Sequence, residues 1–480
     1  MSWMLVWWPL ALALGLYAAG HALLHKRDPR SAWGWMGLSL MLPLAGPLIY
    51  FLMGVNRVNT RAHRMRPPRR ALGRGVGLDH RSDARHHREH QRPVVPAGFR
   101  QVARTVDVIT RRPLLAGNTL QPLHNGEEAF PRMLAAIDAA QESVLLASYI
   151  FDVDVIGERF IAALAKARVR GVRVCVLVDG YAELSLRRRR ASRRLTAEGV
   201  EVLRFHPPTL LPPSLHLNLR NHRKLLIVDG QLGYTGGMNI SHRHMALDPQ
   251  NPVPETDLHF ELRGPIVQQL AEAFADDWRY SGGNACPCPP EPTEAAIEGA
   301  ACRVITDGPN EDLGQLTLVL MSAFASARKR IRIMTPYFLP PRELVAALET
   351  AVMRGVKVEI VLPSRSDLEK VRRAMRHTLG ELVLRGLRIY YQPPPFAHGK
   401  LLMIDGEYAQ IGSANMDPRS LRLNFELVVE VYDAGFALQL NQHFEAVRKR
   451  SHQVRQQELR RQPLRTRLVD AFWWLFSPYL

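Results

Sequence analysis

Two nine-residue segments of the chain place the same polar residues in otherwise apolar runs. They read HRKLLIVDG at 222–230 and HGKLLMIDG at 398–406. Because side chains of an extended strand alternate between its two faces, the histidine and the lysine share one face near the start of each predicted strand. An imidazole beside an ammonium group can act as a nucleophile or a proton carrier next to a bound anion.

A small-residue turn that ends on asparagine follows each segment. It reads GGMN at 236–239 and GSAN at 412–415. Glycines let the backbone approach an oxyanion closely and present N–H groups to it, and asparagine adds a neutral donor. The joint pattern H-x-K-x4-D-x6-G-[GS]-x-N therefore predicts a catalytic site made of His222, Lys224, Asp229, His398, Lys400 and Asp405, with Asn239 and Asn415 as phosphate-binding residues.

The two aspartates also have a structural interpretation. Asp229 and Asp405 come at predicted strand ends before a turn, where a carboxylate can cap the turn or pair with a base at the interface between domains. The position between histidine and lysine is Arg223 in one copy and Gly399 in the other. We interpret this position as free to vary.

Carboxylates that could orient the histidines follow each motif. A histidine that attacks or transfers a proton needs one ring nitrogen held by an acceptor, which fixes its tautomer. The candidate supporting acids are Asp257, 35 residues after His222, and Glu426, 28 residues after His398. The alternative is that both are ordinary surface carboxylates.

No metal and no other cofactor is expected. Lysine and asparagine already supply the electrostatic stabilisation that a divalent cation supplies elsewhere, and no metal-ligand spacing is evident. The cysteines have neither the pattern of a disulfide framework nor that of a paired zinc site; they are Cys175, Cys286, Cys288 and Cys302.

The motifs lie within an internal repeat. Each half contains a strand, a helix and a strand, which is typical of an α/β sheet with parallel neighbours. The predicted elements are 143–151, 157–171 and 172–180, then 330–338, 342–355 and 356–364. We therefore predict an α/β fold of two pseudo-symmetric halves, each a mixed sheet flanked by helices, over 116–280 and 302–480, with a Pro- and Gly-rich linker over 281–301.

The two motifs are expected to meet between the halves. Displacement at a phosphodiester needs a nucleophile on one side of the phosphorus and an acid on the leaving oxygen on the other. One histidine cannot do both at once, whereas two can.

The N-terminal region is apolar. Residues 3–24 and 32–53 each run for 22 residues without a formal charge, which is enough for a helix of about 20 residues to cross a bilayer. We predict a transmembrane helical hairpin over 1–55; a cleaved signal peptide and a buried core hairpin are the alternatives. Basic residues are more numerous after the second span than in the connection, which places the remainder of the chain in the cytoplasm.

A basic juxtamembrane linker is predicted over 56–115. The whole chain has 63 Lys+Arg against 45 Asp+Glu, a net charge of +18, so its partner should be anionic, either nucleic acid or an acidic membrane surface. A basic segment next to a membrane span favours anionic lipid headgroups. The apolar, aromatic segment 468–480 is too short to span and is expected to dock on the domain or to enter the membrane interface.

The paired motifs resemble the signature of the phospholipase D superfamily, in two copies within one chain. The resemblance includes the glycines and the serine of the turns, Gly236, Gly237, Gly412 and Ser413. Together with the N-terminal hairpin, nearly the whole chain resembles the bacterial cardiolipin synthases, only weakly so in 56–95 and 281–301.

This resemblance implies an enzyme of the bacterial inner, or cytoplasmic, membrane. It would join two phosphatidylglycerol molecules into cardiolipin and release glycerol through a phosphohistidine, with His222 as nucleophile and His398 as acid and base. Its partners would be phosphatidylglycerol and anionic membrane lipids, and nucleic acid is not expected. A hydrolase that uses water, a nuclease and a membrane scaffold without activity are the alternatives. Oligomeric state and the use of phosphatidylethanolamine or another alcohol stay open.

Overall fold

A computed structural model describes residues 2–26, 29–54, 93–184, 190–207, 209–210, 213–214, 219–284, 299–309 and 314–478. The chain divides into two compact units, Met1–Arg69 with Pro208–Asn218, and Arg70–Pro207 with Leu219–Leu480. The larger unit holds both motifs. Most of the predicted basic linker and of the Pro- and Gly-rich linker, with Cys286 and Cys288, lies outside the described residues.

The smaller unit contains α1 Ser2–His25, α2 Pro29–Met41, α3 Ala45–Ile49, the π-helix η1 Tyr50–Gly54 and the strands β5 Thr209–Leu210 and β6 Pro213–Ser214. The first predicted span is one helix, but the predicted second helix is broken between Met41 and Ala45. Pro43 lies in the break, and proline has no N–H to donate within a helix. None of the helices in the described residues is both long enough and apolar enough for a membrane crossing.

The larger unit is built on one mixed sheet, in which fifteen strands pair within the described residues. The strands of its first half are β1 Leu115–His124, β2 Ser143–Ser148, β3 Arg173–Asp179, β4 Glu201–Phe205, β7 Leu225–Val228, β8 Leu232–Gly236 and β10 Leu258–Arg263. Those of the second are β11 Ala300–Asp307, β12 Arg330–Met334, β13 Lys357–Pro363, β14 Arg388–Gln392, β16 Leu401–Ile404, β17 Tyr408–Gly412, β18 Glu426–Tyr432 and β19 His452–Gln453.

The order of the strands shows the predicted repeat. The first half runs β1-β10-β8-β7-β2-β3-β4, and the second repeats this order as β11-β18-β17-β16-β12-β13-β14. The two halves join where β1 pairs antiparallel with β11. In each half three strands are parallel, and the motif strand, β7 or β16, runs antiparallel beside the first of them. The mixed α/β fold with two similar halves is thereby confirmed.

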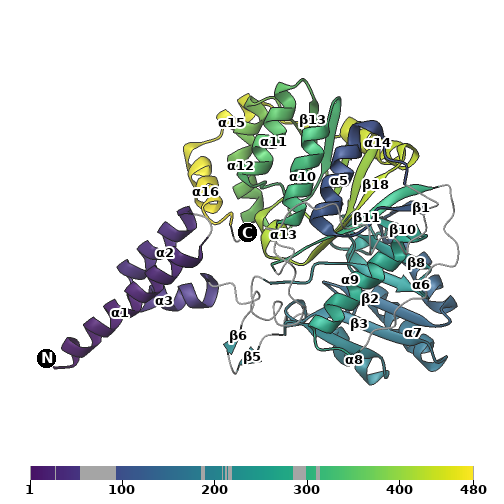
Figure 1. The fold of residues 1–480 in the computed structure, drawn as a ribbon, viewed down its shortest axis with the longest axis horizontal. Helices are drawn as coiled ribbons and strands as arrows, with labels where there is room; N and C mark the ends of the chain where they lie inside the picture. Colours follow the sequence, from purple (N-terminus) through teal and green to yellow (C-terminus); the bar gives the residue numbers. More distant parts are fainter. Residues whose placement is uncertain are drawn as a thin grey trace, which may run out of the picture. The chain divides into compact units, whose positions relative to one another are not determined.

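Helices cover the sheet (Figure 1). In the first half these are α6 Asn125–Ala139, α7 Val155–Val169, α8 Ala191–Ala197 and α9 Ile266–Tyr280; in the second they are α10 Gln315–Ser326, α11 Arg342–Met353, α12 Glu369–Leu384 and α14 Ala434–Lys449. Shorter elements are η3 Ala97–Phe99, η4 Ala182–Leu184, η5 His242–His244, α13 Pro418–Arg422, α15 Gln456–Arg460 and α16 Leu464–Trp474, together with the strand pair β9 Glu255–Thr256 and β15 Phe396–Ala397.

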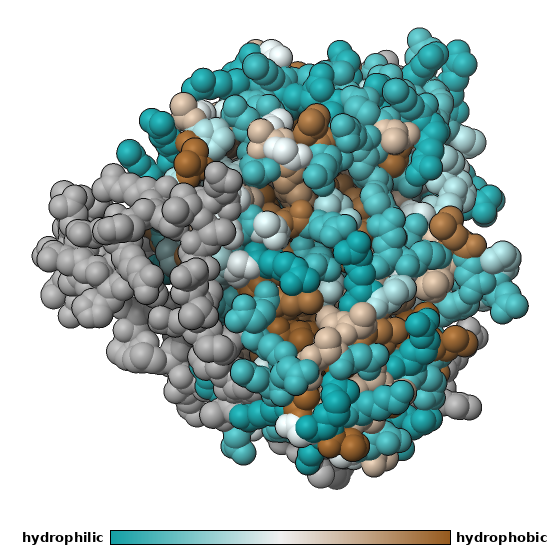
Figure 2. All heavy atoms as spheres, turned by 90° about the vertical axis from the view of Figure 1, so that its right-hand side faces the viewer, coloured by the Kyte–Doolittle hydropathy of each residue, from teal (hydrophilic) through white to brown (hydrophobic). Residues whose placement is uncertain are grey.

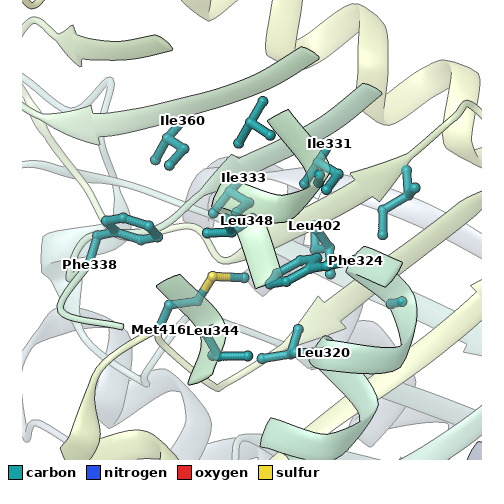
Figure 3. Close-up of a cluster of buried hydrophobic side chains, with 14 of the residues drawn as sticks. Leu320, Phe324, Ile331, Ile333, Phe338, Leu344, Leu348, Ile360, Leu402 and Met416 are labelled. Atoms are coloured by element: carbon teal, nitrogen blue, oxygen red, sulfur yellow. The ribbon is translucent and has the colours of Figure 1, made fainter. Parts of the chain in front are cut away.

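The motif strands are held by the hydrophobic cores. Leu402 of β16 lies in the core of the second half with Ile331 and Ile333 of β12 and side chains of α10 and α11 (Figure 3). Leu226 of β7 takes the corresponding place in the first half. Because alternate residues of each motif strand are locked into a core, the register that presents the preceding histidine and lysine is set as well.

The end of the predicted linker belongs to the core of the second half. Helix α5 (Arg100–Thr110) buries Val102, Ala103 and Val106 in that core, and Phe99 stacks on Tyr408 at 5.3 Å between ring centroids. This differs from the prediction of a linker up to residue 115. The reason is the apolar face that the spacing of these residues creates on one helix.

The outer surface of the larger unit is mostly polar on the side shown in Figure 2, where hydrophobic side chains form small patches. The C-terminal helix differs. Its outward side chains and those just after it are exposed and apolar, namely Leu464, Leu468, Phe472, Trp474, Leu475 and Phe476. The inward Asp470 is buried and receives two hydrogen bonds from Arg376 of α12, at 2.5 and 2.6 Å.

Candidate active site

The two motifs meet through backbone pairing between the halves. The N–H of His222 donates to the carbonyl oxygen of Phe425 at 2.9 Å, and the N–H of His398 donates to that of Thr256 at 2.8 Å. The parallel pairing of β15 with β9 belongs to the same arrangement. The first motif therefore begins beside the segment that leads into β18 of the second half. The second motif begins beside the segment that leads into β10 of the first half.

This pairing gives each histidine the acid of the opposite half. His222 Nδ1 lies 3.0 Å from Glu426 Oε2, and His398 Nδ1 lies 2.9 Å from Asp257 Oδ2. Both predicted acids are thus brought to the site, but crosswise, whereas their sequence order suggested a partner within each half. Tertiary pairing overrides proximity in sequence here, because β10 and β18 start next to the other half's motif.

The hydrogen bonds determine which ring nitrogen is available. A carboxylate only accepts hydrogen bonds, so each Nδ1 carries the hydrogen and each Nε2 keeps its lone pair. Burial lowers the pKa of His222 to about 4, and burial with the charges of Lys400 and Lys224 lowers the pKa of His398 well below its usual value. Both imidazoles are therefore neutral near pH 7 when no anion is bound.

The motif lysines are buried beside the histidines. Lys224 Nζ donates to the carbonyl oxygen of His222 at 2.7 Å, and Lys400 donates in the same way to His398. Burial lowers the pKa of Lys224 to about 7 and that of Lys400 to about 8. Each lysine also lowers the pKa of the histidine in the opposite half, so the four groups form one electrostatic unit.

The small-residue turns lie against the supporting acids. A Cβ at Gly237 would stand 2.3 Å from Asp257 Oδ1, so a larger residue there would displace the acid that holds His398. At the equivalent position, the Ser413 hydroxyl donates to Glu426 Oε2 at 2.5 Å. Of the predicted amides, Asn239 Oδ1 accepts from the N–H of Ile150 at 3.2 Å, and Asn415 Oδ1 is buried without a hydrogen-bond partner among the described residues.

The motif aspartates lie at the other end of their strands. Asp229 and Asp405 have left-handed φ angles of 51° and 55°. The Asp229 carboxylate accepts the N–H groups of residues 141–143, and that of Asp405 accepts those of residues 328–330. Both side chains fix the chain where β2 or β12 begins and do not contact the histidines, which favours the structural interpretation over a catalytic one.

Two further residues of the site did not follow from the sequence. The ring of Tyr149 meets that of His222 edge-on at 5.1 Å and lies 5.5 Å from Lys224 Nζ. Arg223, interpreted as free to vary, is buried and donates to Asp277 at 2.7 Å and to the carbonyl oxygen of Glu426 at 3.0 Å. The sequence did offer a signal for Arg223, because it is a third polar residue, between His222 and Lys224, next to an apolar run.

The described residues contain no group of three or more histidine, cysteine, aspartate or glutamate side chains arranged to hold a metal ion.

Two histidine–lysine motifs that lead into matching strands of a two-part α/β sheet define a phospholipase D-like protein. A family model described as "Cardiolipin synthase, PLD-like domain" matches residues 133–278 and 320–448, and one described as "Phospholipase_D-nuclease N-terminal" matches residues 13–54. The chain belongs to the cardiolipin synthase family.

Curated relatives cover most of the chain. "Cardiolipin synthase A" of Pseudomonas aeruginosa (strain LESB58) is 33% identical over 434 residues, which are 90% of this chain and 87% of the relative. "Cardiolipin synthase 1" of Bacillus anthracis is 31% identical over 469 residues, 95% of this chain and 90% of the relative. The solved structure of phosphatidylserine synthase from Haemophilus influenzae Rd KW20 aligns with a TM-score of 0.63 at 15% identity, over 79% of this chain and 100% of that one, and shows a common fold.

Proposed function

We propose that this chain synthesises cardiolipin by transferring a phosphatidyl group from one phosphatidylglycerol to a second, with release of glycerol. Membership of the cardiolipin synthase family makes it a phosphatidyltransferase. The observation that carries the proposal is the crosswise pair of neutral histidines, each held by a buried acid through Nδ1 and each with Nε2 available.

In the first step, His222 Nε2 attacks the phosphorus of the donor lipid. The bond from phosphorus to the glycerol oxygen breaks, and His398 gives its proton to that oxygen, which leaves a phosphohistidine on His222. The bound phosphodiester supplies the negative charge that raises the pKa of His398 against the two lysines, so that this histidine is protonated before the step.

In the second step, His398 takes the proton from a primary hydroxyl of the acceptor phosphatidylglycerol. The resulting oxygen attacks phosphorus, the bond from phosphorus to His222 breaks, and cardiolipin forms. Lys224 and Lys400, with the side-chain amides of Asn239 and Asn415, would stabilise the non-bridging oxygens as charge builds on them.

Transfer to water, which would give phosphatidic acid, is the second candidate. The site favours transfer to a lipid because both histidines are only 8% exposed. A buried site limits the access of water to the phosphohistidine.

The deciding experiment supplies detergent-solubilised full-length protein with phosphatidylglycerol alone and analyses the lipid products. Cardiolipin and glycerol in equal amounts are expected, with undiminished activity in excess EDTA. Phosphatidic acid without cardiolipin would contradict the proposal, and His222→Ala provides the inactive control. Cleavage of single-stranded or duplex DNA by the same preparation would instead support a nuclease.

We further propose that residues 1–55 anchor the chain in the bacterial cytoplasmic membrane, with the halves 116–280 and 302–480 on the cytoplasmic side. The apolar helix α1, the match of residues 13–54 to an N-terminal family model and the exposed apolar side chains of α16 support this. Protease treatment of inverted membrane vesicles should cut the α/β unit, and its protection there would contradict the orientation.

A further inference from the structure

Arg220 is a buried cation whose hydrogen-bond donors are unused among the described residues. Its side chain is 1% exposed, and none of its guanidinium nitrogens has a hydrogen-bond partner among the described residues. Its Cζ lies 4.1 Å from the centre of the Tyr181 ring. A buried guanidinium has five donors, and leaving them unpaired costs more free energy than a cation over an aromatic ring recovers.

The nearby acid does not satisfy this arginine. Asp179 Oδ1 lies 3.9 Å from Arg220 Nη1, beyond hydrogen-bond distance. The Asp179 carboxylate instead accepts the backbone N–H groups of Tyr181, Ala182 and Asn221 at 3.0 to 3.1 Å. Burial raises the pKa of Asp179 to about 6, even though the charge of Arg220 opposes this shift. The hydrogen-bond donors of the guanidinium therefore have no acceptor among the described residues.

Arg220 belongs to the same face of the chain as the catalytic pair. It stands two residues before His222 and four before Lys224. The neighbouring Asn221 forms a parallel β-bridge with Phe425, and in such extended backbone alternate side chains share a face. Its backbone is fixed by the Phe425 N–H, which donates to the Arg220 carbonyl at 2.8 Å. Burial lowers the pKa of Arg220, and the charge of Arg419 in α13 of the other half contributes to the same shift.

The second half lacks this cation. Phe396 stands at the position equivalent to Arg220, two residues before His398, with its ring 6.0 Å from that imidazole. Pro363, at the end of β13, is equivalent to Asp179 at the end of β3. Among the described residues, the motif histidine and lysine occur in both halves, whereas Phe396 stands in the second half where the first has the cation of Arg220.

The proposed reaction also brings to the site one phosphodiester that does not react. The phosphodiester of the donor lipid reacts between the two motifs, whereas that of the acceptor phosphatidylglycerol stays intact. We infer that Arg220 binds the intact phosphodiester of the acceptor lipid, an inference that rests on the proposed function. This contact would position the terminal hydroxyl of the acceptor lipid for attack on the phosphohistidine. Guanidinium groups suit this task because they bind phosphate oxygens in a bidentate manner.

Two reactions of the full-length, detergent-solubilised protein test this assignment. Cardiolipin formation uses phosphatidylglycerol as acceptor, whereas exchange of labelled glycerol into phosphatidylglycerol uses an acceptor without a phosphate. Arg220→Gln should reduce kcat/KM for cardiolipin formation about tenfold more than it reduces glycerol exchange. Arg220→Lys should lie between the wild type and Arg220→Gln. Arg204→Gln, which removes an exposed arginine from β4, is the matched control.

Stability measurements separate binding from a structural role. Without lipid, Arg220→Gln should leave the thermal unfolding midpoint nearly unchanged, because the guanidinium has no hydrogen-bond partner among the described residues and its ion pair with Asp179 spans 3.9 Å. A lowered midpoint together with equal losses in both reactions would overturn the inference, and so would equal rates for variant and wild type. Wild-type protein that exchanges glycerol but makes no cardiolipin would overturn the proposed function, and the acceptor site with it.

Discussion

The two halves of the active site differ around the same chemical groups. Each half supplies a histidine, a lysine and a supporting acid, but Glu426 accepts hydrogen bonds from His222, Ser413 and Asn424, whereas the Asp257 side chain accepts from His398 and from the N–H of Leu258. The residue before Lys224 is the buried Arg223, and the residue before Lys400 is a glycine.

This difference indicates how a duplicated domain serves a reaction with unlike substrates. In the proposed reaction, the groups that act on phosphorus are needed on both sides of it, and these groups are repeated. The groups that contact the rest of each lipid are needed once, because donor and acceptor present different atoms to the site. The predictions below compare equivalent positions of the two halves.

The largest effect is expected at the histidines. His222→Ala and His398→Ala should each lower cardiolipin formation by about 10³-fold or more, since each removes a reacting group. The two histidines should differ in a trapping experiment: wild-type protein, denatured at neutral to alkaline pH shortly after mixing with phosphatidylglycerol, should carry the phosphatidyl group on His222. Mass spectrometry of the peptides identifies the site. Modification of His398 in place of His222 would reverse the assignment.

The supporting acids should have the next largest effect. Glu426→Gln and Asp257→Asn should lower kcat by about 10²- to 10⁴-fold, because an amide can stabilise the wrong imidazole tautomer. The crosswise arrangement predicts strong non-additivity for Glu426 with His222 and for Asp257 with His398. Double-mutant cycles on kcat measure this coupling, and stronger coupling within each half would contradict the observed pairing.

The motif aspartates should affect stability similarly in the two halves. Asp229→Ala and Asp405→Ala each leave three backbone N–H groups without their acceptor, which should cost about 1–3 kcal/mol of unfolding free energy. Denaturant unfolding followed by circular dichroism gives the value. A large loss of kcat in a variant that keeps wild-type stability would restore the catalytic interpretation of these residues.

The lysines should produce the smallest difference, visible in the pH dependence of stability. Burial lowers the pKa of both lysines below the 10.5 of an exposed lysine. The unfolded chain therefore binds these protons more tightly than the folded chain does. As a result, the stability of the wild type rises with pH between the folded pKa and 10.5. The advantage in melting temperature of Lys224→Met over wild type should therefore shrink from about pH 7 upward, and that of Lys400→Met from about pH 8. If the difference in melting temperature between variant and wild type stays constant across this pH range, the burial of the lysine charges is contradicted.

Much of the site could be predicted because its signals are local. His222 and Lys224 occupy alternate positions in an apolar run, and the same spacing recurs at His398 and Lys400, so strand geometry places each pair on one face. The order of strands and helices likewise indicated a mixed α/β sheet. The break of the predicted second N-terminal helix near Pro43 also had a local signal, since proline interrupts helical hydrogen bonding.

The sequence by itself therefore determined that a histidine, a lysine and a following asparagine recur with the same spacing in two copies. Only the tertiary structure decided which acid holds which histidine, because that depends on β-pairing between segments 141 and 204 residues apart. It likewise decided that Asp229 and Asp405 bind backbone, that Arg223 is buried, and that the Arg220 guanidinium has no hydrogen-bond partner among the described residues. Sequence spacing sets local geometry, whereas burial and long-range partners arise when the two halves pack together.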